Sequence, residues 1–99
     1  MAVQGEVKER TGNKFKEPHQ YQVIMWNDDF TTMAFVVEVL VTIFHKDETA
    51  AEALMLDVHK KGKAAVGRYP YDIAATKVRR ALSLARDKGF PFRMTIEEA

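Results

Sequence analysis

YQVIMWNDDFTTM, at residues 21–33, is the stretch of this chain that decides its fold. Its first half, 21–26, is apolar and rich in residues that favour strands, so it predicts a buried β-strand. Its second half, 27–32, carries Asn, Asp and Thr, which form turns and cap helix N-termini. The stretch therefore predicts a strand that turns into a helix, with one amide and two carboxylates gathered at the turn.

The residues that follow the turn have the period of an amphipathic helix. Apolar side chains recur at i, i+3, i+4, i+7 and i+8 in Val36, Val39, Leu40, Ile43 and Phe44. This period and the preceding cap outweigh the low helix propensity of the valines, and they predict a helix over 34–44.

The rest of the chain adds two helices and two strands. The spacing of Thr49 and Glu52 matches a capping box, so a second helix is expected to open there and to stop at Gly62. A short strand over 63–69, a third helix from near Asp72 to Gly89 and a final strand over 92–96 follow. The predicted fold is α/β (α+β): one small β-α-α-β-α-β domain in which a three-stranded, partly antiparallel sheet packs with three helices.

Composition bounds the class of protein. The chain has 99 residues, a formal net charge of +1 and no cysteine. These values favour a single domain and give no sign of nucleic-acid binding, a disulfide framework or a zinc finger. The longest apolar run, 33–44, is interrupted by Glu38 and too short to span a bilayer, and residues 1–12 are too polar for a signal peptide. We expect a cytoplasmic protein with no membrane contact, a disordered arm over 1–18 and a folded core over 19–99.

Catalysis and metal binding are weakly indicated. Asp28 or Asp29 could orient His59 as a base, but no nucleophile accompanies them, since cysteine is absent and Ser83 lies within the third predicted helix. The sequence contains no glycine-rich phosphate loop. His19, His45 and His59 lack the spacing of a metal site. We expect no enzyme activity, no metal and no cofactor.

A binding site for an ammonium group is the stronger interpretation. Asn, Asp and neutral His side chains all offer hydrogen-bond acceptors. Met33 and Met55 flank these acceptors in the sequence, although methionine at helical spacing is more often core filler than pocket lining. Periodicity alone leaves His59 open between this role and that of a partly buried structural histidine.

Two separated segments, 21–37 and 55–64, resemble the signatures of ClpS, the bacterial adaptor family of the N-degron pathway. The match continues through 67–77 and 91–99, and it extends from about residue 20 to the C-terminus. Members of the family bind proteins with N-terminal Phe, Tyr, Trp or Leu and deliver them to a ClpA-type AAA+ unfoldase working with the ClpP protease. They are adaptors, not enzymes.

The resemblance also implies residue roles. It implies an ammonium site of Asn27, Asp28 and His59, peptide-backbone contacts from Asp29 and Thr31, and an apolar pocket of Met33, Val36, Met55, Val58 and Phe92. Met33 would reject β-branched residues. Asp72, Lys77 and the arm over 1–18 would engage the unfoldase.

The chain departs from the family at several positions. Phe30, Thr32, Pro70-Tyr71, Ala75 and Phe92 replace the usual Tyr, Pro, Thr-Ala, acidic residue and Leu. A larger ring at Phe92 could shrink the pocket, so we expect an altered preference among Phe, Tyr, Trp and Leu. The departures also suggest a divergent second copy of the family. The alternative is a generic interaction domain of the same fold, which would not depend on a free N-terminus.

Overall fold

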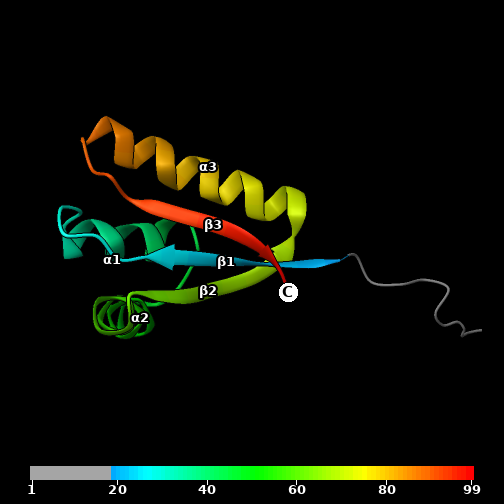
Figure 1. Cartoon of the computed structure of the whole chain (residues 1–99), viewed down its shortest axis with the longest axis horizontal. Coiled ribbons are helices and arrows are strands. Elements are labelled where there is room, and N and C mark those ends of the chain that lie inside the picture. The colour runs from blue at the N-terminus through cyan, green and yellow to red at the C-terminus, as the bar shows by residue number, and fades with distance from the viewer. Residues whose placement is uncertain (1–18) are drawn as a thin grey trace, which may run out of the picture.

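The computed structural model describes residues 19–99, so the predicted arm over 1–18 lies outside the described residues. The elements are β1 (Gln20–Trp26), α1 (Met33–Thr42), α2 (Glu48–Lys61), β2 (Lys63–Pro70), α3 (Tyr71–Asp87) and β3 (Arg93–Glu98) (Figure 1). The predicted order β-α-α-β-α-β is confirmed.

The sheet has the strand order β2-β1-β3, with β1 in the centre (Figure 1). Both pairings are antiparallel, where the sequence indicated this only in part. The β1–β2 register shifts between Val23, which pairs with Gly67, and Ile24, which pairs with Ala65, so Val66 is the extra residue of a bulge in β2. A Cβ atom at Gly67 would lie 2.8 Å from the Tyr69 hydroxyl, so the ring of Tyr69 occupies the space that a side chain would need.

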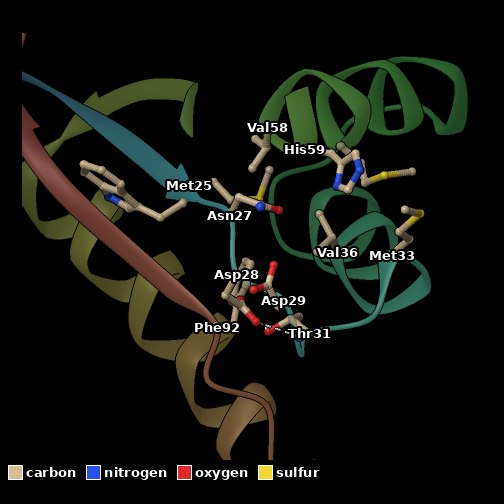
Figure 2. A pocket seen from close by; sticks show the side chains of 12 residues that line it. Met25, Asn27, Asp28, Asp29, Thr31, Met33, Val36, Val58, His59 and Phe92 are labelled. Carbon is tan, nitrogen blue, oxygen red and sulfur yellow. Dashed lines mark hydrogen bonds between the residues drawn. The ribbon is translucent and has the colours of Figure 1, made fainter. Parts of the chain in front are cut away.

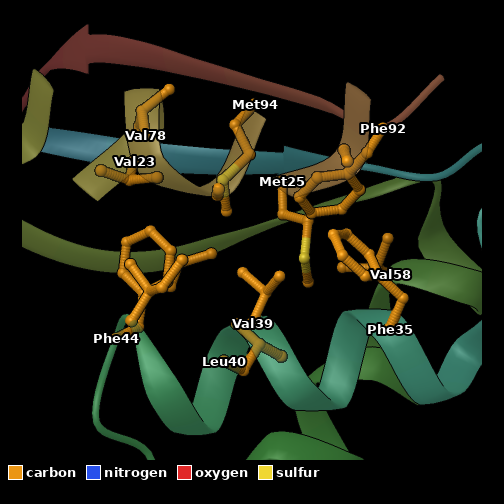
Figure 3. Packing of buried hydrophobic residues seen from close by; sticks show 14 of the residues in the cluster. Val23, Met25, Phe35, Val39, Leu40, Phe44, Val58, Val78, Phe92 and Met94 are labelled. Atoms are coloured by element: carbon orange, nitrogen blue, oxygen red, sulfur yellow. The ribbon is translucent and has the colours of Figure 1, made fainter. Parts of the chain in front are cut away.

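The core lies between the sheet and the helices. Side chains alternate along a strand, so Val23 and Met25 point to the same face of β1, and both are fully buried. They pack against Val39 and Leu40 of α1 and Val78 of α3 (Figure 3). The core therefore fixes β1 and α1 relative to each other, and with them the turn that joins the two elements.

The first two helices differ from prediction at their boundaries. Helix α1 ends at Thr42, not at 44, because the chain leaves the helix through His45 at a φ of 58°. The Lys77 ammonium donates to the Ile43 carbonyl at 2.8 Å and so satisfies one carbonyl that this ending exposes. Helix α2 starts before Thr49, because Asp47 is its N-cap and accepts a hydrogen bond from the Ala50 amide at 2.7 Å.

The last strand also differs from prediction. β3 runs over Arg93–Glu98, not 92–96, because Tyr21 pairs with Glu98 and Trp26 pairs with Arg93. Phe92 therefore lies just before the strand, where its ring reaches the core. No helix within residues 19–99 is long and apolar enough to cross a membrane.

Candidate functional site

A cavity of about 170 Å³ opens where β1 ends, between the start of α1 and the end of α2 (Figure 2). Every residue that the sequence assigned to the ammonium, backbone and side-chain parts of the site lines this one cavity. The lining consists of Met25, Trp26, Asn27, Asp28, Asp29, Thr31, Met33, Val36, Met55, Val58, His59 and Phe92. Residues far apart in the sequence thus meet at one place, with polar groups beside apolar ones.

Asp28 holds the turn in shape. Its carboxylate accepts hydrogen bonds from the backbone amides of Phe30, at 2.8 Å, and Thr31, at 2.7 Å. It also accepts one from the Thr31 hydroxyl at 2.7 Å (Figure 2). Partial burial raises the pKa of Asp28, but these three hydrogen bonds outweigh it and hold the pKa below its usual value. The carboxylate has about four acceptor positions, so the turn leaves it about one for a ligand.

Asp29 is more available. It is exposed and lines the cavity. Among residues 19–99 no side-chain hydrogen bond reaches its carboxylate, in contrast to that of its neighbour. Among the described residues, Asp29 therefore presents a carboxylate with unused acceptor positions beside the apolar part of the cavity.

Asn27 and His59 are placed by a link between β1 and α2. The backbone amide of Asn27 donates a hydrogen bond to the Gly62 carbonyl at 2.9 Å. Gly62 ends α2 in the left-handed conformation, with a φ of 91°, and its amide bonds back to Val58. His59 lies in the last turn of that helix, so the link sets the position of its backbone relative to Asn27. His59 is exposed and not partly buried, which disagrees with the structural alternative.

The inner wall of the cavity is apolar and rigid. Met25 is fully buried, and Val58 and Phe92 are 4% and 7% exposed. The ring of Phe92 packs edge-on against Phe35, with 5.6 Å between ring centroids. Met33 differs from them because half of its surface, 51%, is exposed at the cavity mouth. A ligand side chain would enter past this flexible residue and meet fixed walls.

The sequence interpretation did not assign Met25 or Trp26 to the site. Met25 could have been found, because it is the last residue of β1 on the core-facing side of the strand. Trp26 lies on the other side, where its indole NH donates to the Thr95 hydroxyl at 2.9 Å. Cationic groups of Lys63 and Arg93 lie 4.9 and 4.5 Å from its ring centroid. These contacts anchor the end of β1 and so the turn that follows.

Asp72 and Lys77 are not part of this cavity. Asp72 is exposed in the first turn of α3. Lys77 is half-buried, and its ammonium caps α1 and lies 5.5 Å from the centroid of the Tyr69 ring. Within residues 19–99 no group of His, Asp and Glu side chains could hold a metal ion.

The arrangement suits a ligand with two ends. Acceptors at the rim can receive the three N–H donors of an ammonium group, and the apolar wall can bury a side chain attached to it.

Known proteins with similar sequences and folds identify the family of this chain. The family model described as "ATP-dependent Clp protease adaptor protein ClpS" matches residues 16–95. A ClpS adaptor of Acetivibrio thermocellus is 50% identical over 97 residues, 98% of either chain. One of Treponema denticola is 52% identical over 85 residues, covering 86% of this chain and 84% of the relative.

A solved structure shares the fold. Agrobacterium tumefaciens ClpS2 bound to L-phenylalaninamide superposes with a TM-score of 0.80 at 36% identity, covering 84% of this chain and 100% of that one. The relatives are named as adaptors, which is a non-enzymatic role. With a family model that matches most of its length, this chain belongs to the ClpS family of Clp protease adaptor proteins.

Proposed function

We propose that this adaptor binds cytoplasmic proteins through a free N-terminal Phe, Tyr, Trp or Leu and delivers them to a ClpA-type unfoldase for degradation by ClpP. The observation that carries the proposal is the single cavity in which Asn27, Asp29 and His59 border an apolar wall. The relative from Agrobacterium tumefaciens, which has the same fold, binds L-phenylalaninamide, a molecule with a free amine and a benzyl side chain.

The ammonium group is best received by Asp29, Asn27 and His59. Charge-assisted hydrogen bonds are worth about 1.5–3 kcal/mol each, so a carboxylate with free acceptor positions is the strongest partner available. Asp28 uses most of its acceptor positions in the turn, and we give it one remaining contact with the ligand in addition to its structural task. Thr31, bonded to Asp28, then stands beside the peptide backbone.

The apolar wall selects the side chain. Burying a Phe or Leu side chain contributes roughly 1.5–3 kcal/mol, which is too little alone to overcome the cost of association. An acetylated N-terminus would lose the polar contacts, and an N-terminal Gly would lose the apolar ones. Met33, half-exposed at the mouth of the cavity, would exclude residues branched at Cβ, such as Val and Ile.

Delivery would use a different surface. We propose the exposed beginning of α3, with Asp72, as a contact for the unfoldase, together with residues 1–18. Lys77 would support this surface, because its ammonium donates to the Ile43 carbonyl and so joins α3 to the end of α1.

Fluorescence anisotropy tests the proposal directly. A labelled peptide that starts with Phe should bind, and the same peptide either N-acetylated or starting with Val should not. Asp29→Asn should weaken binding of the Phe peptide by at least tenfold, about 1.4 kcal/mol. Equal binding of the free and acetylated peptides would overturn the proposal and favour a generic interaction domain.

A further inference from the structure

The outer edge of β3 has no strand beside it among the described residues. β3 pairs with β1 only, so it forms one border of the sheet (Figure 1). The Ala99 amide donates to the Gln20 carbonyl, next to β1, at 3.1 Å. Backbone groups point alternately to the two sides of an antiparallel strand, so the amides and carbonyls of Met94 and Ile96 point away from β1. These groups are free to pair with a further strand.

The other border of the sheet is less suited to a further strand. β2 contains the bulge at Val66, followed by Gly67, and it ends at Pro70. Bulges, glycine and proline all weaken the edge of a sheet as a template for pairing. β3 has none of these features, and its register with β1 is continuous over Arg93–Glu98. Helix α3 contacts all three strands, so it lies across the inner face of the sheet.

The side chains of β3 make its edge complementary to a second copy of itself. Arg93, Thr95 and Glu97 lie on one face of the strand, and Met94 and Ile96 lie on the other. In an antiparallel pair of β3 strands centred on Thr95, each Arg93 faces the Glu97 of the other copy, and each Met94 faces an Ile96. Registers centred one residue to either side would set Glu97 opposite an uncharged residue. The charges therefore favour one register.

Both charged residues are available for this contact. Arg93 and Glu97 are exposed, and within residues 19–99 neither forms an ion pair. The Arg93 guanidinium lies 4.5 Å from the centroid of the Trp26 ring. Stacking on a ring uses the face of a guanidinium and leaves the N–H donors at its edge free. Trp26 can therefore hold Arg93 in place while its donors reach a carboxylate of a second copy.

We propose that two copies of this chain pair through their β3 edges and form one continuous sheet about a two-fold axis at Thr95. The proposal is independent of the proposed function, because β3 does not line the cavity. Met94 of each copy would exchange backbone hydrogen bonds with Ile96 of the other. The two-fold axis uses both edges, so the assembly closes as a dimer. Since the paired edge has only 6 residues, the dimer should be weak and reversible.

Sedimentation velocity tests the charge pairing. The parent chain should form more dimer as its concentration is raised. Arg93→Glu and Glu97→Lys each set like charges opposite one another at two places, so each should weaken dimerisation about tenfold or more. An equimolar mixture of these two variants should dimerise again, because every charge in the mixed pair faces an opposite charge. Glu52→Lys, the same charge change on an exposed position of α2, should dimerise like the parent chain.

A disulfide cross-link tests the register with both charges left in place. The chain has no cysteine, so a disulfide in Thr95→Cys can join only two copies. On the axis, the two residues would form a non-hydrogen-bonded pair with Cα atoms about 4.5 Å apart, which a disulfide can bridge. Glu97→Cys is the control, because its two copies would lie roughly 14 Å apart. We expect rapid covalent dimerisation of Thr95→Cys and slow cross-linking of Glu97→Cys.

Three results would overturn the pairing of β3 edges. One is a parent chain that stays monomeric at its highest soluble concentration. Another is a mixture of Arg93→Glu and Glu97→Lys that associates no better than either variant alone. The third is cross-linking of Thr95→Cys no faster than that of Glu97→Cys, which would place any association on another surface. Peptide binding would not be affected by these results, so the proposed function would stand.

Discussion

Two adjacent carboxylates have different tasks in the turn after β1. Asp28 receives three hydrogen bonds from within the turn, and Asp29 receives none from another described side chain or from the turn amides. The sequence could place both residues at the site but could not assign these tasks, because the assignment depends on which carboxylate folds back over Phe30 and Thr31. The resemblance implied an ammonium contact for Asp28 and a peptide-backbone contact for Asp29, and our proposal that Asp29 is the main ammonium partner is supported by the number of acceptor positions that Asp28 uses in the turn.

Substitution of each aspartate should separate stability from binding. Asp28→Ala removes the three hydrogen bonds and should lower the free energy of unfolding by about 1–3 kcal/mol, measured by urea denaturation. Asp29→Asn should leave that free energy within about 0.5 kcal/mol of the parent value, as for other surface substitutions, and should weaken peptide binding. The opposite pattern would return the ammonium to Asp28.

The lowered pKa of Asp28 also predicts a pH dependence of stability. Between the folded pKa and the unfolded value of about 3.9, the unfolded chain binds more protons than the native one. The stabilisation is therefore complete above this window and is lost as pH falls through the folded pKa. Asp28→Asn should show a shallower loss of stability on acidification, and an unchanged acid limb would contradict this cause.

Binding should depend on the acceptor nitrogen of the His59 ring. His59 lines the cavity, and a ring nitrogen with an unused lone pair can accept a hydrogen bond from an ammonium group. His59→Ala removes this acceptor, so we expect it to weaken binding of the Phe peptide severalfold, measured by fluorescence anisotropy. His59→Gln keeps a side-chain acceptor and should retain more of the affinity. Equal affinity of the two variants would mean that His59 acts sterically or as a donor.

Among the elements, the end of α2 controls the site most directly. Gly62 ends the helix in the left-handed conformation, and its carbonyl accepts a hydrogen bond from the backbone amide of Asn27. The backbone of Gly62 therefore holds β1 and α2 together. A Cβ atom at Gly62 would meet nothing within 4 Å, so substitution there costs conformational energy only.

Gly62→Ala should lower the free energy of unfolding by about 1–2 kcal/mol. It should also weaken peptide binding, because strain at this residue moves the carbonyl that positions Asn27. Gly89→Ala is the matched control, since Gly89 also has a positive φ, 77°, and open space for a Cβ atom, but lies outside the cavity. The control should lose stability and keep its affinity. Loss of affinity in both variants would mean that global destabilisation, not the link, weakens binding.

The end of α1 depends on α3. The Lys77 ammonium reaches the Ile43 carbonyl across a sequence separation of 34 residues and lies 5.8 Å from the centroid of the Phe44 ring. Lys77→Met keeps an apolar stem but loses this cap, and we expect it to lower the free energy of unfolding by about 1–2 kcal/mol. Arg80→Met on the exposed face of α3 should have little effect. Peptide affinity should be unchanged in both, and equal stability of the two variants would remove the structural task of Lys77.

At the scale of the whole molecule, the sequence predicts whatever depends on local pattern. The order of elements, the core-facing residues Val39 and Leu40 and the turn at 27–32 all follow from periodicity and capping chemistry. The first residue of α2 could not be predicted in this way. Asp47 and Thr49 can both cap a helix, and only the path of the chain out of α1 decides between them. The bulge at Val66 and the link from Lys77 to Ile43 depend on contacts between distant segments that no local pattern contains.

The most direct test of the account is an NMR titration of the full chain with L-phenylalaninamide and with its N-acetyl derivative. We predict saturable shifts confined to 27–33, 55–59 and Phe92 with the free amine, and none with the acetylated compound. Such a result would place recognition of both a free ammonium group and an apolar side chain in the one cavity. Shifts of equal size with the two compounds, or shifts centred on another surface, would mean that this cavity does not recognise a free N-terminal ammonium group.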